Sequence, residues 1–100
     1  MASKKKTAGA KAPIRRRRVT LSVEALHAET VSLMGDFNQW NEKKHPMKKG
    51  KHGRWEKIIV VHPGRYESRF LVDGQWQNDP NNDQVCTNRF GSTNNILEIM

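Results

Sequence analysis

The stretch YESRFLVDGQW, residues 66–76, decides the fold class because it holds a strand, a tight turn and the start of a second strand. Apolar and polar side chains alternate along residues 66–72, which is the period of a half-buried β-strand. Asp73 and Gly74 follow directly, and this pair favours the hairpin turn that needs positive φ at both central positions. The stretch therefore predicts a β-hairpin, with Trp76 just beyond its tip.

The two faces of this strand differ in what they are expected to contact. Phe70 and Val72 share one face, which we expect to point into the core. Arg69 lies on the opposite face, on the strand whose hairpin partner carries Trp76. Trp55 begins another β-prone run, and the sequence leaves it open between the core and the rim.

Short β-prone runs between polar turns continue through the chain, and no window favours a helix. The expected strands cover residues 19–23, 30–34, a short segment near Met47, 55–61, 66–72, 75–76, 84–87 and 95–100. This pattern predicts an all-β fold, an immunoglobulin-like antiparallel β-sandwich of about seven strands. The Cys…Trp…Cys core of immunoglobulin domains is missing, because Cys86 is the only cysteine.

Charge divides the chain into two parts. Residues 1–18 contain eight basic and no acidic residues, which equals the whole net charge of +8. Residues 19–100 contain ten basic and ten acidic residues and are therefore neutral overall. Because the basic part has few apolar side chains, we expect residues 1–18 to form a disordered Lys/Arg-rich tail and residues 19–100 to form one domain.

Several classes of site and location are excluded or disfavoured by composition. A single cysteine permits neither an intrachain disulfide nor a cysteine-based zinc site. The histidines show no metal-ligand spacing, and no glycine motif for phosphate is present, so we expect no metal and no cofactor. The histidines are His27, His45, His52 and His62. No apolar run has the length of a signal peptide or membrane span, so we expect a cytoplasmic protein with no membrane partner.

Trp40 and Trp76 stand apart from the core aromatics, because each lies among Asn, Gln or Asp in a loop or at a hairpin end. Aromatic rings beside hydrogen-bonding side chains suit a sugar, whose C–H face stacks on the ring while its hydroxyls take directional hydrogen bonds. The polar stretch RFGSTNN, residues 89–95, supplies more such side chains. These residues together indicate a carbohydrate-binding surface.

Three motifs, in order, resemble the glycogen-binding modules of carbohydrate-binding family 48. They are GDFNQWN (35–41), RFLVDGQWQNDP (69–80) and GSTNNILEI (91–99). The family includes the module in the β subunit of AMP-activated protein kinase and the early-set domains that precede isoamylase and branching-enzyme barrels. The resemblance runs from about residue 19 to the C-terminus and implies an early-set sandwich that binds α-1,4-glucan on one face without catalysis. It also implies association with a glycogen-metabolism enzyme or a kinase.

The resemblance assigns a role to six positions by residue match. They are Trp40 and Trp76 as stacking platforms, Arg69 and Asn94 as hydrogen-bonding residues, and Phe90 and Ser92 as lesser contacts. Arg69, Phe90 and Ser92 depart from the Lys, Leu and Thr of the kinase-subunit modules. Lys to Arg replaces a point donor with a planar fork, and Leu to Phe enlarges the apolar wedge. We therefore expect binding to be kept, with an altered preference among glucans.

Two other function classes compete with glucan binding. A glycoside hydrolase needs two carboxyl groups across a cleft, but the clustered Asp73, Asp79 and Asp83 are of the kind that turns use for backbone reasons. A catalytic role is therefore not expected. The alternative function is an interaction module in which the sandwich is a scaffold and residues 4–18 bind a polyanion, such as nucleic acid, or an acidic protein.

Overall fold

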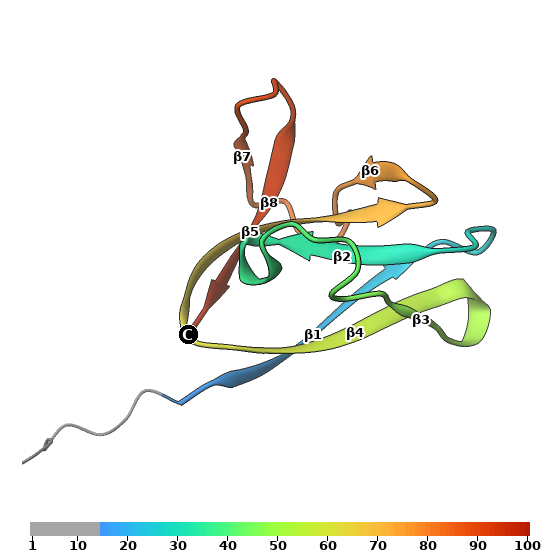
Figure 1. The fold of residues 1–100 in the computed structure, drawn as a ribbon, viewed down its shortest axis with the longest axis horizontal. Coiled ribbons are helices and arrows are strands. Elements are labelled where there is room, and N and C mark those ends of the chain that lie inside the picture. Colours follow the sequence, from blue (N-terminus) through green and yellow to red (C-terminus); the bar gives the residue numbers. More distant parts are fainter. Residues whose placement is uncertain (1–14) are drawn as a thin grey trace, which may run out of the picture.

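The computed structural model describes residues 15–100, which form two antiparallel β-sheets (Figure 1). The strands are β1 (Arg17–Glu24), β2 (Val31–Gly35), β3 (Lys48–Lys49), β4 (Arg54–Val61), β5 (Gly64–Val72), β6 (Gln75–Gln77), β7 (Val85–Thr87) and β8 (Thr93–Ile99). One sheet has the order β1-β4-β3. The other has the order β2-β5-β8-β7, with β6 paired to β5. The predicted all-β antiparallel sandwich is confirmed.

A single cluster of buried side chains joins the two sheets. Leu21 on β1 and Ile59 on β4 come from the first sheet, and Leu33 on β2 and Phe70 on β5 come from the second. Phe70 is only 2% exposed, so the face predicted to point inward does so. Burial of these alternating apolar side chains supplies the main force that holds the sheets together.

Trp55 belongs to this core and not to the rim. Its side chain is 6% exposed, and its indole Nε1 donates a hydrogen bond to the Ala25 carbonyl at 3.0 Å. A buried indole N–H needs such a partner, because an unpaired donor in the interior is costly. Trp55 is therefore a core residue of the sandwich.

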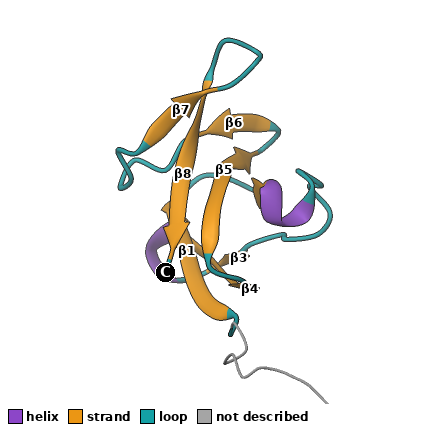
Figure 2. Ribbon diagram, turned by 90° about the vertical axis from the view of Figure 1, so that its left-hand side faces the viewer, coloured by secondary structure: helices purple, strands orange, loops and turns teal. Residues whose placement is uncertain are grey.

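Strand β5 is the centre of its sheet. Its C-terminal half pairs with β2 on one edge and with β6 on the other, and its N-terminal half pairs with β8. The hairpin turn between β5 and β6 has φ of 49° at Asp73 and 80° at Gly74, as the Asp-Gly pair predicted. Figures 1 and 2 place β6 beside the β7–β8 hairpin, at the end of β8 away from the C-terminus.

The structure departs from the predicted elements at several strand starts and in two short turns. Strands β5 and β8 each begin two residues before the predicted start, at Gly64 and Thr93. Strand β1 begins at Arg17, two residues before the predicted start at residue 19, because Arg17 and Arg18 pair with Val61 and Val60 of β4 through backbone groups, which any side chain allows. Short 3-10 turns also occur at Asp36–Asn38 and Lys51–Gly53 and are too brief to give a helical period.

Residues 1–14 of the predicted disordered tail lie outside the described residues. Within residues 15–100 no helix is long and apolar enough to cross a membrane.

Candidate functional site

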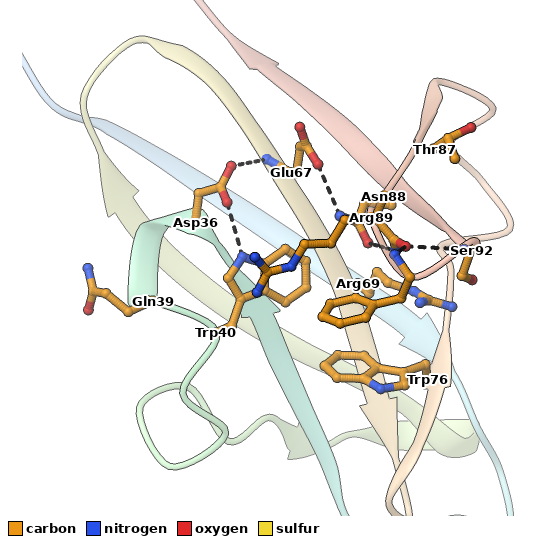
Figure 3. A pocket seen from close by; sticks show the side chains of 12 residues that line it. Asp36, Gln39, Trp40, Glu67, Arg69, Trp76, Thr87, Asn88, Arg89 and Ser92 are labelled. Atoms are coloured by element: carbon orange, nitrogen blue, oxygen red, sulfur yellow. Dashed lines mark hydrogen bonds between the residues drawn. The ribbon is translucent and has the colours of Figure 1, made fainter.

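An open hollow of about 1060 Å³ lies over β5, between the turn after β2 and the loop that joins β7 to β8 (Figure 3). All six residues that the sequence singled out line it. They are Trp40, Arg69, Trp76, Phe90, Ser92 and Asn94. The tertiary structure thus brings together side chains from the turn after β2, from β5, β6 and β8, and from the loop before β8. This convergence makes the hollow the candidate site.

The two tryptophans touch in the hollow but do not share a plane. The ring centroids of Trp40 and Trp76 are 6.0 Å apart, and the ring planes meet at 67°, which is an edge-to-face contact. Trp76 is 48% exposed, whereas Trp40 is half-buried. The pair therefore forms a bent apolar surface, with Trp76 as its more open part.

The ring of Trp40 is held to the sheet by one carboxylate. Its Nε1 donates to Oδ1 of Asp36 at 3.0 Å, and Oδ2 of Asp36 accepts from the backbone N–H of Glu67 on β5 at 2.8 Å. Both oxygens of Asp36 are therefore engaged, one by the indole and one by the central strand (Figure 3). Asp36 fixes the orientation of this ring relative to β5.

The backbone around Trp40 adopts an uncommon conformation. Gln39 and Trp40 both have positive φ, 56° and 57°, which costs free energy for any residue other than glycine. The turn is held by Asn38, whose Oδ1 accepts from the Gly35 N–H and whose Nδ2 lies 2.7 Å from Nδ1 of His45. Because Asn38 is 1% exposed, these bonds are shielded from water and offset the strain in the turn.

The ring of Trp76 makes a cation–π contact with Arg69. The Arg69 guanidinium lies 5.4 Å from the ring centroid of Trp76, within the range of a cation–π contact. Arg69 Nε also donates to Oδ1 of Asn78 at 2.8 Å, and Asn78 Nδ2 donates to Oγ1 of Thr93 at 2.9 Å. Partial burial lowers the pKa of Arg69 from its ordinary value. This network ties Trp76 on β6 to β5 and β8.

Phe90 and Ser92 lie on the turn between β7 and β8. Phe90 is 81% exposed, and the guanidinium of Arg89 lies 5.0 Å from the centroid of its ring. The backbone N–H groups of Phe90 and Ser92 both donate to Oδ1 of Asn88. An exposed aromatic ring thus projects from a turn that is closed by hydrogen bonds.

Asn94 is the most buried of the six predicted residues, at 7% exposed. Its Nδ2 donates to Oε1 of Glu67 at 3.0 Å, and its Oδ1 accepts from Nδ2 of Asn88 at 3.1 Å. Within residues 15–100 the Asn94 amide group donates one hydrogen bond, to Glu67, so one of its two hydrogens is left over. Asn94 therefore connects the two sides of the hollow as well as lining it.

Glu67 carries a negative charge beside Asn94. Its Oε2 also forms an ion pair with Nη1 of Arg65 at 3.0 Å. The hydrogen bond from Asn94, followed by that from Arg65, lowers the pKa of Glu67 below its ordinary value of 4.5. Glu67 is therefore ionised at neutral pH and acts only as a hydrogen-bond acceptor.

Six further polar residues line the hollow, and sequence reasoning assigned a role to none of them: Asp36, Gln39, Glu67, Thr87, Asn88 and Arg89. Asp36, Glu67 and Asn88 matter most, because their side chains hold other residues of the site. A signal was present for Glu67, because the period of two places it on the same strand face as Arg69. Asp36 and Asn88 each lie in a turn, where their type is explained equally well by backbone needs. Only the contacts of their side chains reveal them as parts of the site.

Two of the three clustered aspartates, Asp73 and Asp79, accept hydrogen bonds from backbone N–H groups. Oδ1 of Asp73 accepts from the backbone N–H groups of Glu29 and Thr30, and Oδ1 of Asp79 accepts from the Asn81 N–H. Among residues 15–100, no three His, Cys, Asp or Glu side chains are grouped to hold a metal ion. The carboxylates that line the hollow are Asp36 and Glu67 instead.

Comparison with known protein families identifies this domain. The family described as "Glycogen recognition site of AMP-activated protein kinase" matches residues 20–100. The chain is 38% identical over 69 residues to 5'-AMP-activated protein kinase subunit beta-1 of Sus scrofa, covering 69% of this chain and 53% of the relative. The predicted resemblance to glycogen-binding modules is confirmed.

Two plant proteins are also similar to this chain. Protein FLOURY ENDOSPERM 6, chloroplastic, of Oryza sativa subsp. japonica is 38% identical over 72 residues, which is 72% of this chain and 13% of the relative. Protein PTST homolog 2, chloroplastic, of Arabidopsis thaliana is 39% identical over 72 residues, with the same coverage of 72% and 13%. The chain spans about half the length of the pig kinase subunit and a smaller share of both plant proteins.

The cytoplasmic location expected from the sequence is wrong in view of these relatives. Both plant relatives are named chloroplastic, which contradicts a cytoplasmic assignment. The expectation rested on the lack of a long apolar run. The lack of such a run does not tell one compartment from another.

Proposed function

The chain belongs to the family of glycogen recognition sites of AMP-activated protein kinase, and from this membership we propose that residues 19–100 bind α-1,4-glucan of the glycogen or starch type without catalysing a reaction. The observation that carries the proposal is the convergence of all six expected contact residues on one hollow. Family membership supports the class of ligand, and the hollow offers aromatic rings and hydrogen-bonding side chains suited to a sugar.

Trp40 and Trp76 are the stacking platforms in this proposal. Their edge-to-face arrangement supports binding of a curved chain, because consecutive glucose units of a helical glucan present their C–H faces at changing angles. Burial of roughly 100 Å² on each ring, at about 25 cal/mol per Å², gives about 5 kcal/mol before ordering costs. We therefore expect modest affinity for a short oligosaccharide, with Kd about 10 µM to 1 mM.

Polar residues supply the directional contacts. Arg69 presents donors beside Trp76, and Asn94 has one amide hydrogen left for a sugar hydroxyl. Phe90 projects as an apolar wedge, and Ser92 offers its hydroxyl on the same turn. Rings flanked by fixed hydrogen-bonding groups are the combination that a pyranose requires.

The contacts of the two carboxylates in the hollow support a non-catalytic role. A glycosidase needs one carboxyl that is protonated at working pH to act as general acid. Glu67 has a lowered pKa and pairs with Arg65, and both oxygens of Asp36 accept hydrogen bonds from protein groups. Neither group is suited to donate a proton to a leaving sugar.

The test is a titration of maltoheptaose or β-cyclodextrin, followed by intrinsic tryptophan fluorescence and by calorimetry. The wild-type protein is expected to show saturable binding, and Trp76→Ala is expected to weaken it at least tenfold, from the lost ring burial. Val60→Ala is the matched control, because Val60 is an exposed apolar residue of the other sheet, and it should bind as the wild type does.

A β-1,4-linked glucan of equal length should bind more weakly, because its extended chain does not follow a bent pair of rings. A flat titration up to several millimolar, with circular dichroism showing a folded protein, would contradict the proposal. The sandwich would then serve another partner.

The wider setting is also a proposal. Because the relatives are longer proteins, we propose that this domain brings an associated kinase or glucan-metabolism enzyme to its glucan. The names of the two plant relatives support a plastid as the location, which imaging of the tagged protein in plant cells would check. Co-purification of an enzyme on amylose resin, lost with Trp76→Ala, would support the first proposal.

A second role is proposed for residues 4–18, which carry the excess charge. Arg15 to Arg18 are exposed, and residues 19–100 are neutral overall, so attraction to a polyanion or acidic protein would come from this end alone. Affinity for duplex DNA that falls steeply with salt, and that is lost when Lys4, Lys5, Lys6 and Lys11 become glutamine, would support the role. No binding even at low salt would remove it.

A further inference from the structure

Phe90 poses a structural problem, because its ring receives little support from the protein. At 81% exposed it is not part of the core cluster, and its ring interaction within the described part of the chain is with the guanidinium of Arg89, 5.0 Å from the ring centroid. Packing therefore does not determine where this ring lies. Its position must be set by the backbone of the turn that carries it.

That turn is closed by a single side chain. Oδ1 of Asn88 accepts from the N–H of Phe90 at 2.9 Å and from the N–H of Ser92 at 3.1 Å. The backbone of Asn88 adds two bonds, donating to the Ser92 carbonyl at 2.8 Å and accepting from the Gly91 N–H at 3.2 Å. Asn88 thus makes four bonds within a five-residue turn.

The same side chain connects the turn to the centre of the sheet. Nδ2 of Asn88 donates to Oδ1 of Asn94, and Nδ2 of Asn94 donates to Oε1 of Glu67 on β5. Since Arg65 pairs with the other oxygen of Glu67, the end of this chain of hydrogen bonds is held on β5. Such connected networks in partly buried surroundings are stiffer than isolated bonds.

We infer that Asn88 is a positioning residue, which fixes the Phe90 turn to strand β5 through Asn94 and thereby presents the Phe90 ring to the glucan. The inference rests on the proposed function and deepens it. An amide is needed at this position, because one end must accept from two backbone N–H groups while the other donates to Asn94. Aspartate keeps only the accepting end, and alanine keeps neither.

The first test reads the turn in the free protein by amide hydrogen exchange in NMR. In the wild type the amides of Phe90 and Ser92 should be protected, and in Asn88→Ala both should exchange about tenfold faster. Asn88→Asp should keep most of this protection, because its carboxylate still accepts both bonds. Unchanged protection of β5 amides shows that each variant is folded, and unchanged exchange of Phe90 and Ser92 in Asn88→Ala would overturn the inference.

The second test is a double-mutant cycle with maltoheptaose. Asn88→Ala should weaken binding about fivefold, and Phe90→Ala about tenfold. If Asn88 acts through Phe90, the double variant should bind no more weakly than Phe90→Ala alone. If the affinity of the double variant falls by the product of the two single-variant factors, Asn88 acts independently of Phe90, and the inference is overturned.

The two tests separate failure of this inference from failure of the proposed function. A wild-type protein that does not bind maltoheptaose would overturn the proposed function, and with it the presentation of Phe90 to glucan. Binding together with additive losses, or with unprotected Phe90 and Ser92 amides, would overturn the positioning role of Asn88 alone.

Discussion

Trp40 and Trp76 meet edge to face with their ring centroids 6.0 Å apart, although one lies in the turn after β2 and the other on β6. Each ring is held from a different direction, Trp40 by the carboxylate of Asp36 and Trp76 by the guanidinium of Arg69. A bent pair that is fixed before the ligand arrives loses less side-chain entropy on binding than two free rings would. Under the proposed function, this geometry would favour recognition of a curved glucan chain.

Fluorescence should distinguish the three tryptophans. Replacing both Trp40 and Trp76 with phenylalanine leaves Trp55, which is 6% exposed and belongs to the core. The emission of this double variant should not change on addition of maltoheptaose, because the remaining ring is not exposed to the ligand. Trp55→Phe should keep the full response of the wild type, and a saturable change in the double variant would contradict the assignment.

Arg69→Ala should weaken maltoheptaose binding about tenfold, because the variant loses both the cation–π contact with Trp76 and the hydrogen bond to Asn78. Arg69→Lys should give an intermediate loss, since lysine keeps the charge but not the planar group that makes both contacts. Calorimetric titration of the two variants measures the difference. Equal losses for lysine and alanine would mean that charge at this position contributes nothing.

Gly35→Ala should destabilise the domain by about 1–3 kcal/mol through overpacking. A Cβ at this position would lie 2.6 Å from Cε2 of Phe37 and 2.8 Å from the carbonyl oxygen of Glu67, and that backbone atom cannot move aside easily. Urea denaturation measures the change in the free energy of unfolding. Thr20→Ala, at an exposed position of β1, is the control and should change it by no more than about 0.5 kcal/mol.

His45 should make stability depend on pH just below neutrality. Oδ1 of Asn38 accepts from Gly35, so Nδ2 is the atom that faces His45, and the ring nitrogen Nδ1 must accept this bond without a proton. Burial, followed by the charges of Lys57 and Lys44, lowers the pKa of His45 from its ordinary value of 6.5. The folded state therefore binds the proton less readily than the unfolded state does.

This contribution is fully present above about pH 6.5 and is lost progressively as the pH falls below it. Thermal unfolding between about pH 7 and pH 5 should show the loss, at values above the range where Glu67 and Asp73, whose pKa values are lowered, take up protons. His45→Gln does not titrate and should flatten the curve in this interval. A wild-type curve that is already flat there would contradict the role of His45.

Much of the strand framework could be read from the sequence, because it depends on neighbouring residues. The period of two along residues 66–72 places Phe70 inside and Arg69 outside, and the Asp-Gly pair alone sets the hairpin turn. The three glycogen-module motifs also selected six residues, and all six line the hollow. These strand and turn features could be predicted because the alternation of side chains along a strand and the residue types of a turn are local properties of the chain.

The tertiary structure decided what depends on distant partners. Burial of Trp55, the bent contact of Trp40 with Trp76, and the bond from the Glu67 N–H to Asp36 each join segments that the sequence separates. The same is true of Asn88, whose amide is an ordinary turn residue until strand pairing brings Asn94 beside it. The direction of a loop side chain follows from hydrogen bonds to groups on other strands, and no local pattern encodes those groups.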